Sequence, residues 1–166
     1  ALLAMPPFLV QLAFISAFRL AVYVDCLRIV GALLILYALS ATCQVYALAP
    51  ELKSPTGALN AVLALNVVTG FILATGVWVL SIPFLGSTAN SIARAMTVVL
   101  RLSPAFNLAN ALLTLPNTAL PGFSTVYGME PLDWEVAGEP LFALVVNFAL
   151  YALVAMNRGI APGPVL

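Results

Sequence analysis

Polar side chains recur at helical spacing in two short segments of an otherwise apolar chain. The first set is spaced at four, three and four residues and the second at three and four: Asn90, Arg94, Thr97 and Arg101, then Asn107, Asn110 and Thr114. At about 100° per residue, each set forms one stripe along a helix. Ser103-Pro104 separates the sets, because proline disfavours the helical conformation of the residue before it. We therefore predict two short helices over about 90–115, each about half as long as a hydrocarbon core is thick.

Carboxylates gather in the segment 129–140, MEPLDWEVAGEP, which holds four of the six acids: Glu130, Asp133, Glu135 and Glu139. Such a cluster could bind a cation or act as a catalytic carboxylate pair. Acids are also favoured near a helix N-terminus by the helix dipole, and we favour this solvated, helix-starting interpretation.

Other chemistry is missing from the sequence. It has no histidine, the commonest general base, and Cys26 and Cys43 are interpreted as packing residues. It also lacks a Gly-rich phosphate loop, an H-E-x-x-H motif and a nucleophile elbow. We expect no catalytic residues, no metal site and no cofactor within this chain.

The composition places the chain in a membrane. It is 63% hydrophobic and 7% charged, whereas a soluble domain is about 45–50% apolar and about 25% charged. Net charge is zero and no basic patch is present, so we expect a lipid bilayer as partner and no nucleic acid.

Uncharged runs of the required length predict an all-α, polytopic helical membrane protein. We expect about four transmembrane helices, over about 5–24, 29–49, 58–82 and 140–157. The segment PELKSPTG, 50–57, is predicted to be a loop because it holds two prolines and a glycine.

The two short helices over about 90–115 are predicted to form a re-entrant hairpin. The alternative is one kinked span with both arginines pushed to an interface. We favour the hairpin because Arg94 and Arg101 together would be costly at mid-depth.

Polar and small residues also lie inside the span 58–82: Asn66, Thr69 and Gly70. They could form part of a substrate path. Close helix packing with interhelical hydrogen bonds is the interpretation we favour, since this is the usual role of such residues in membrane bundles.

Four spans and a hairpin put both termini and the loop 50–57 on one side of the membrane. The distribution of Lys and Arg only weakly favours the termini outside. The chain begins at Ala1 rather than at methionine, and we expect it to be a fragment of a longer protein.

Three stretches resemble the A subfamily of ATP-binding-cassette (ABC) transporters. SPAFNLANALL, 103–113, resembles the subfamily's outer-leaflet helical hairpin, a proline–x–aromatic–x–Leu–Gly–x–Gly–Leu pattern, at Pro104, Phe106, Leu108 and Leu112. PLDWEVAGEPLFALVVN, 131–147, is similar to its entry into the last helix of a transmembrane half. LYALSATCQVYALAPELKSPTGA, 36–58, is similar to its fourth helix, coupling loop and the start of its fifth helix. The stretches keep family order, and the alignment runs from about Met5 to Asn157.

The resemblance implies that residues 1–166 are a partial transmembrane domain, helices three to six of one half, without the nucleotide-binding domain. It implies a cytoplasmic coupling loop with Glu51, Leu52, Lys53 and Pro55, and an extracytoplasmic hairpin with Arg94, Arg101, Pro104, Phe106, Asn107 and Asn110. The expected function is the transmembrane portion of an ATP-driven exporter of lipids or related amphiphiles. ATP and Mg would bind only to a nucleotide-binding domain elsewhere, and a second transmembrane half would be a partner.

Two other functions stay open at this point. One is a non-catalytic membrane subunit of a larger, energy-transducing complex. The other is a small channel or facilitator that uses the re-entrant loop as a filter, with Ser103 and Pro104 at its tip.

Overall fold

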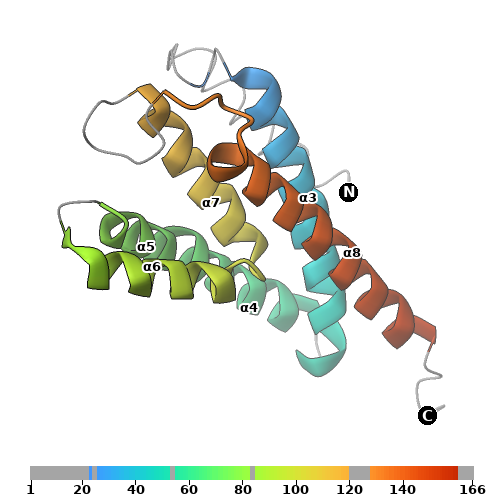
Figure 1. Cartoon of the computed structure of the whole chain (residues 1–166). Coiled ribbons are helices and arrows are strands. Elements are labelled where there is room, and N and C mark those ends of the chain that lie inside the picture. Colours follow the sequence, from blue (N-terminus) through green and yellow to red (C-terminus); the bar gives the residue numbers. More distant parts are fainter. Residues whose placement is uncertain (1–22, 24–25, 53–54, 83–84, 120–127, 161–166) are drawn as a thin grey trace.

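A computed structural model of the chain describes residues 23, 26–52, 55–82, 85–119 and 128–160. Within these ranges every regular element is a helix (Figure 1). Apart from Tyr23, the predicted span 5–24 lies outside the described residues, and so does Lys53 of the predicted coupling loop.

Three helices are long and apolar enough to cross a membrane, and they cover Leu27–Leu52, Leu59–Leu80 and Trp134–Asn157. They coincide, within a few residues, with the second, third and fourth spans predicted from the sequence. Their outward faces carry exposed large apolar side chains, including Ile35, Leu63, Phe71, Leu153 and Met156. A continuous apolar surface of this kind is suited to lipid rather than water. The chain is therefore an all-α membrane protein.

Each of the three long helices is built from more than one helical segment. The first consists of α3 (Leu27–Leu48) and a 3-10 turn (Ala49–Leu52). The second consists of α4 (Pro55–Val67), a π-helical segment (Val68–Leu73) and α5 (Ala74–Leu80). The third consists of a π turn (Trp134–Gly138) and α8 (Glu139–Ile160).

The second long helix begins earlier than expected. The sequence predicted a loop through residue 57, but α4 starts at Pro55. Proline is well suited to the first position of a helix, because its missing N–H would have no intrahelical partner there. Pro55 therefore marks the entrance to α4, while Pro50 lies in the 3-10 turn that follows α3.

Two short helices lie between the second and third long helices in the chain: α6 (Ser87–Leu100) and α7 (Pro104–Thr114), the latter followed by a 3-10 turn (Leu115–Ala119). The break lies where Ser103-Pro104 predicted it. Ser103 adopts an extended conformation, φ −92° and ψ 121°, and its Oγ accepts a hydrogen bond from the N–H of Phe106. Ser103 is thus the N-cap of α7, with Pro104 as its first residue.

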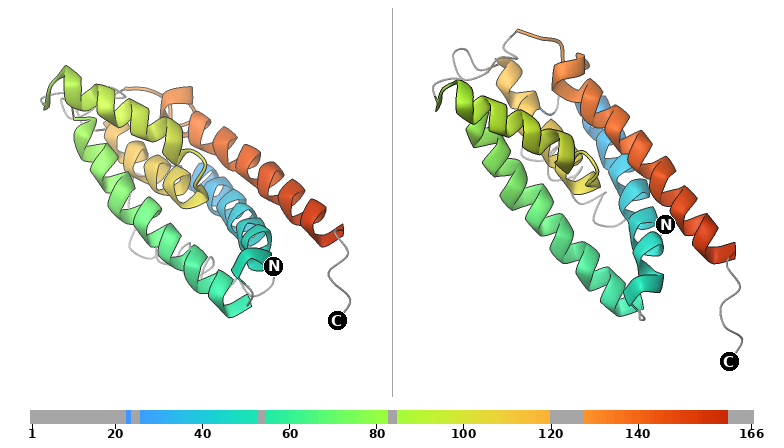
Figure 2. Two further views of the ribbon diagram at one scale, coloured as in Figure 1. Left: turned by 90° about the horizontal axis from the view of Figure 1, so that it is seen from below. Right: turned by 60° about the horizontal axis from the view of Figure 1, so that its bottom comes forward.

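The helices are arranged around α7. Helices α3 and α8 lie side by side and run in the same direction, and α7 packs against both of them and against the π segment (Figures 1 and 2). Helix α6 runs back along α5. One buried cluster joins α3, α7 and α8, including Leu33, Ala111 and Leu144. A second joins α5, α6 and α7 around Phe106, which is fully buried.

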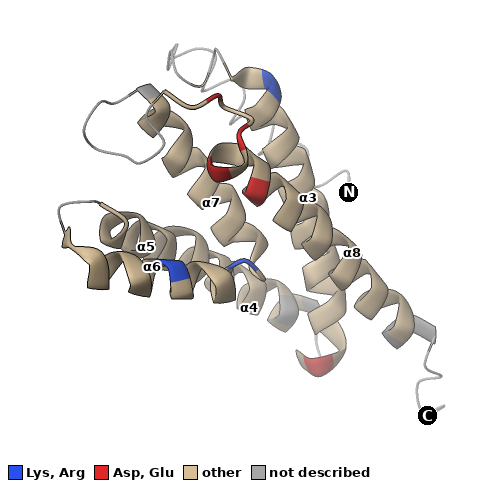
Figure 3. Cartoon of the chain, in the orientation of Figure 1, with Lys and Arg blue, Asp and Glu red and all other residues tan. Residues whose placement is uncertain are grey.

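Charged side chains are confined to a few places (Figure 3). Acids gather at the start of α8 and in the segment before it, and one lies at the turn between α3 and α4. Basic residues lie on α6 and at the start of α3. One base and one acid from these groups pair: Arg101 at the end of α6 and Glu139 at the start of α8, where the candidate site lies.

Candidate functional site

The turn between α6 and α7 reaches the middle of two long helices. Its backbone carbonyls accept hydrogen bonds from α8: Asn147 Nδ2 donates to the carbonyl of Arg101 at 2.9 Å, and Tyr151 Oη donates to the carbonyl of Leu102 at 2.9 Å. Both donors lie in the central part of α8. In hydrocarbon an unpaired carbonyl is costly, and these side chains supply donors that the end of α6 lacks.

The same turn is held from the other side by the π segment. Thr69 Oγ1 and Ser103 Oγ are 2.7 Å apart and both residues are buried. Beside them, Gly70 lies so close to α7 that a Cβ placed on it would be 2.9 Å from Ala105 Cβ and 3.1 Å from its carbonyl oxygen. Only glycine permits this approach of the two backbones. The turn is therefore clamped between the second and third long helices.

An ion pair lies above the turn. Arg101 Nη2 donates to Glu139 Oε2 at 2.6 Å and its Nε donates to Glu139 Oε1 at 3.2 Å, so the guanidinium holds both carboxylate oxygens. Arg101 Nη1 donates to Asn107 Oδ1 at 3.1 Å, and Asn107 Nδ2 returns a bond to the Arg101 carbonyl at 2.7 Å. The Arg101 guanidinium also lies 5.9 Å from the centre of the Phe106 ring. The arginine thus links α6, α7 and α8.

This pair is a contact that the sequence did not predict. Glu130, Asp133 and Glu135 are exposed, and Glu139 begins α8 with its side chain 41% exposed, which agrees with the solvated, helix-starting interpretation. Glu139 is also the partner of Arg101, whose side chain is only 14% exposed. A guanidinium at this depth requires a counter-charge, and the first carboxylate of α8 supplies it. Asp133 also has a local role, because its Oδ2 accepts from the N–H of Glu130 at 2.9 Å.

The predicted polar stripe of α6 does not act as one unit. Asn90 faces the end of α5, where its amide can donate to the carbonyls of Leu80 and Ser81 at 3.1 and 3.2 Å. Thr97 donates to the carbonyl one turn back in its own helix. Arg94 is exposed. Of the α6 stripe, only Arg101 takes part in the ion pair.

The second stripe divides in the same way. Asn107 is fully buried and bonded to Arg101, whereas the carbonyl of Asn110 accepts from Thr114 Oγ1 at 2.6 Å within α7. Pro104 and Phe106 are buried at the start of α7. The structure therefore brings Arg101, Asn107, Pro104 and Phe106 together and leaves Arg94 and Asn110 outside this cluster.

The contacts of the residues inside the second long helix are those of helix packing. Asn66 Nδ2 donates to Tyr37 Oη at 3.4 Å, while its buried Oδ1 has no partner among the described residues. Thr69 and Gly70 face the turn, as described above. A role for these residues in a substrate path stays a prediction.

The predicted coupling loop lies at the opposite end of the long helices from the acids of α8 (Figure 3). Glu51 and Leu52 are exposed in the 3-10 turn after α3. Pro55 opens α4, and its side chain is outside the described part of the chain.

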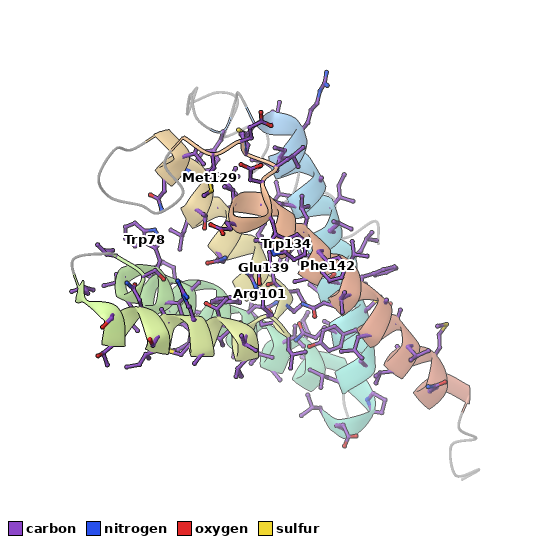
Figure 4. All side chains as sticks on the ribbon, in the orientation of Figure 1. Trp78, Arg101, Met129, Trp134, Glu139 and Phe142 are labelled. Atoms are coloured by element: carbon purple, nitrogen blue, oxygen red, sulfur yellow. The ribbon has the colours of Figure 1, made fainter. Side chains whose placement is uncertain are left out.

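An open hollow of about 280 Å³ lies beside the ion pair, on the outer side of α8. Arg101, Glu139 and Asn147 provide its polar wall. Its apolar wall includes Trp134 and Phe142, whose ring centres are 5.7 Å apart. Figure 4 shows Trp134 and Phe142 flanking Glu139, with Arg101 directly beneath. Among the described residues, no group of three or more acids or cysteines is placed to hold a metal ion.

The sequence did not single out Asn147 and Tyr151, and it named Glu139 only as one of four clustered acids. A signal was present: Glu139, Asn147 and Tyr151 are separated by multiples of four residues, which places them along one stripe of a helix. In a span of this hydropathy, such a stripe indicates an interhelical partner.

No protein family, curated protein or solved structure matches this chain. The resemblance to ABC transporters therefore depends on the three stretches quoted above.

Proposed function

We propose that the chain is the transmembrane portion of an ATP-driven exporter of the ABC type, which moves lipids or related amphiphiles across the membrane. The turn after α3 and the start of α4 would receive motion from a nucleotide-binding domain that is not in this sequence. The α6–α7 pair would cap the outer-leaflet half of the path. The localisation that follows is an integral, multi-pass membrane protein.

One observation carries this proposal: the α6–α7 turn is bonded to the middle of both flanking long helices. Thr69 holds it from the second long helix, and Asn147 and Tyr151 hold it from the third. A pair anchored in this way covers half of the length of the bundle. When the two long helices move relative to each other, the turn must either move with them or lose some of these hydrogen bonds. In hinge and shear transitions packed helices move as units, so a turn bonded to both helices responds to their relative movement.

The same turn argues against an ion-selective filter. A filter of backbone groups offers carbonyl oxygens to passing ions. Here the carbonyls of Arg101 and Leu102 accept bonds from α8 side chains, and Ser103 Oγ is bonded to Thr69. The polar groups of the turn are turned toward the protein, so the channel alternative has no support from this geometry.

The transport proposal is tested by supplying a nucleotide-binding domain of the ABC type. The chain is reconstituted together with this domain in vesicles that contain a fluorescent phospholipid. The accessibility of the lipid to an external quencher is then followed. We expect ATP-dependent transfer that is lost when the ATPase site of the added domain is inactivated. The chain alone should bind no ATP and conduct no ions. Stoichiometric ATP binding by the chain, or an ion flux without ATP, would overturn the proposal.

The re-entrant arrangement is tested separately by cysteine labelling. Both native cysteines are replaced by serine, and single cysteines are placed at Glu51, Thr88 and Glu130, which are exposed. A membrane-impermeant maleimide should label Thr88→Cys and Glu130→Cys from one side and Glu51→Cys from the other. Labelling of Thr88→Cys and Glu130→Cys from opposite sides would mean that α6 and α7 together form one crossing.

A further inference from the structure

We infer that the hollow beside Arg101 and Glu139 is a headgroup site for a phospholipid with a choline headgroup. The inference requires only that α8 spans a membrane, and it does not depend on the proposed transport activity. It rests on four groups that line one hollow: a guanidinium, a carboxylate and two aromatic rings.

The guanidinium provides the anion-binding part. Arg101 has five N–H donors. Two of these hold Glu139 and one holds Asn107. One N–H on Nη1 and one on Nη2 have no partner among the described residues. The side chain is 14% exposed and lines the hollow, so an acceptor bound there reaches the guanidinium. Arginine–phosphate pairs are short, charge-assisted and frequently bidentate, so a phosphate oxygen is a suitable acceptor.

The carboxylate and the rings provide the cation-binding part. Glu139 is 41% exposed, so its charge is felt in the hollow although Arg101 holds it. Trp134 and Phe142 are 58% and 59% exposed and their rings are tilted by 48° to each other. Aromatic faces next to a carboxylate are the chemistry that recognises a quaternary ammonium group. A second net negative charge at this place would be repelled by Glu139, which disfavours a purely anionic lipid.

The size and depth of the hollow agree with a headgroup. At about 280 Å³ it lies just below the range of about 300–1,000 Å³ found for pockets that enclose whole ligands. It therefore suits part of a lipid whose chains remain in the bilayer. The hollow begins at Trp134, the first residue of the apolar span Trp134–Asn157, where the interface begins, and it reaches Asn147 in the central part of α8. The phosphate would face Arg101, the choline would face Glu139 and the rings, and the chains would lie along α8.

Tryptophan quenching by brominated lipids tests the inference. The chain has two tryptophans, and Trp78 lies on α5, well away from the hollow that Trp134 lines (Figure 4). Trp78→Phe leaves Trp134 as the reporter of the hollow, and Trp134→Phe leaves Trp78 as the matched control. Each variant is placed in bilayers in which a minor fraction of the lipid is brominated, once as phosphatidylcholine in phosphatidylglycerol and once with the headgroups exchanged.

We expect brominated phosphatidylcholine to be enriched around Trp134 by about threefold or more, in the range of one exposed cation–π contact, and to show no enrichment around Trp78. Phe142→Leu, added to Trp78→Phe, should remove most of the enrichment while leaving the ion pair in place, because one exposed cation–π contact accounts for about the whole expected effect. Glu139→Gln should abolish it. If Glu139→Gln fails to fold, the effect of Phe142→Leu on the enrichment around Trp134 still tests the inference.

Three results would overturn the inference. Equal quenching of Trp134 by both lipids would exclude a headgroup site. Equal enrichment of brominated phosphatidylethanolamine, measured in the same way, would exclude recognition of the quaternary ammonium by the rings. Full enrichment in the Phe142→Leu variant would exclude a contribution of that ring.

Discussion

The pairing of Arg101 with Glu139 can be tested by removing the charge of the carboxylate. In Glu139→Gln one oxygen remains as an acceptor, but the second position becomes an amide that donates and therefore opposes the guanidinium. Arg101 would keep its bond to Asn107 and lose the counter-charge. We expect this variant to be clearly less stable than the parent protein.

The magnitude follows from the exposure of the two partners. Removal of one partner from a fully buried pair costs about 3–5 kcal/mol, whereas an exposed pair contributes about 0.2–1 kcal/mol. Arg101 is 14% exposed and Glu139 is 41% exposed, so solvent reaches the carboxylate but hardly the guanidinium. We therefore expect Glu139→Gln to lower the free energy of unfolding by about 1.5–2.5 kcal/mol.

The measurement is equilibrium unfolding by SDS in mixed micelles, followed by tryptophan fluorescence. Glu139→Gln, Arg101→Met and the double variant form a cycle, whose expected coupling energy is about 1–2 kcal/mol. Glu135→Gln is the matched control, because Glu135 is an exposed acid one turn earlier and should change stability by less than about 0.5 kcal/mol. A coupling energy below about 0.5 kcal/mol, or equal effects of the two Glu→Gln substitutions, would refute the role assigned to the pair.

Three further predictions concern the clamp around the turn, with the same unfolding assay. Asn147→Leu removes a donor to a carbonyl of the turn and should cost about 0.5–1.5 kcal/mol, so an unchanged midpoint would contradict that bond. Tyr151→Phe removes only the hydroxyl that bonds the next carbonyl and should cost about 0.5–1.5 kcal/mol; a more stable variant would show that the hydroxyl is not needed there. Gly70→Ala should destabilise the protein by about 1 kcal/mol, because overlap with Ala105 outweighs the better helix propensity of alanine. Gly76→Ala is the control and should be neutral or stabilising, because there is open space around Gly76. Equal effects of the two glycine substitutions would rule out the close approach.

The parts of the fold that depend on local chemistry were predictable from the sequence. The break in 90–115 was predicted because proline disfavours the helical conformation of the residue before it. The structure adds that Ser103 is the N-cap of α7 and Pro104 its first residue. The three described long helices followed from apolar length alone. The start of α4 at Pro55 was missed, because proline marks both loops and helix entrances.

Features that depend on contacts between residues far apart in the sequence, or on a change of helix type, were not predictable from local sequence patterns. Glu139 looks like its neighbouring acids in the sequence, and its partner Arg101 lies 38 residues away. The π segment at Val68–Leu73 was also invisible, because one extra residue in a turn leaves the hydropathy of a span unchanged. The sequence therefore identified half of the site, the residues at the helix break, while the half contributed by α8 required the fold.

The hydrogen bonds that close the α6–α7 turn bear on how the protein enters the membrane during synthesis. The α8 donors to the Arg101 and Leu102 carbonyls lie 46 and 49 residues further along the chain, and Asn107 of α7 supplies a nearer donor to the Arg101 carbonyl. A nascent chain that has only reached the end of α7 would therefore hold the Leu102 carbonyl without the Tyr151 hydroxyl that bonds it, and hydrocarbon does not tolerate an unpaired carbonyl. We expect the two short helices to wait at the membrane surface until α8 has been made. Insertion of this half of the bundle would then be a late, cooperative event, in which the last helix carries the preceding pair into place.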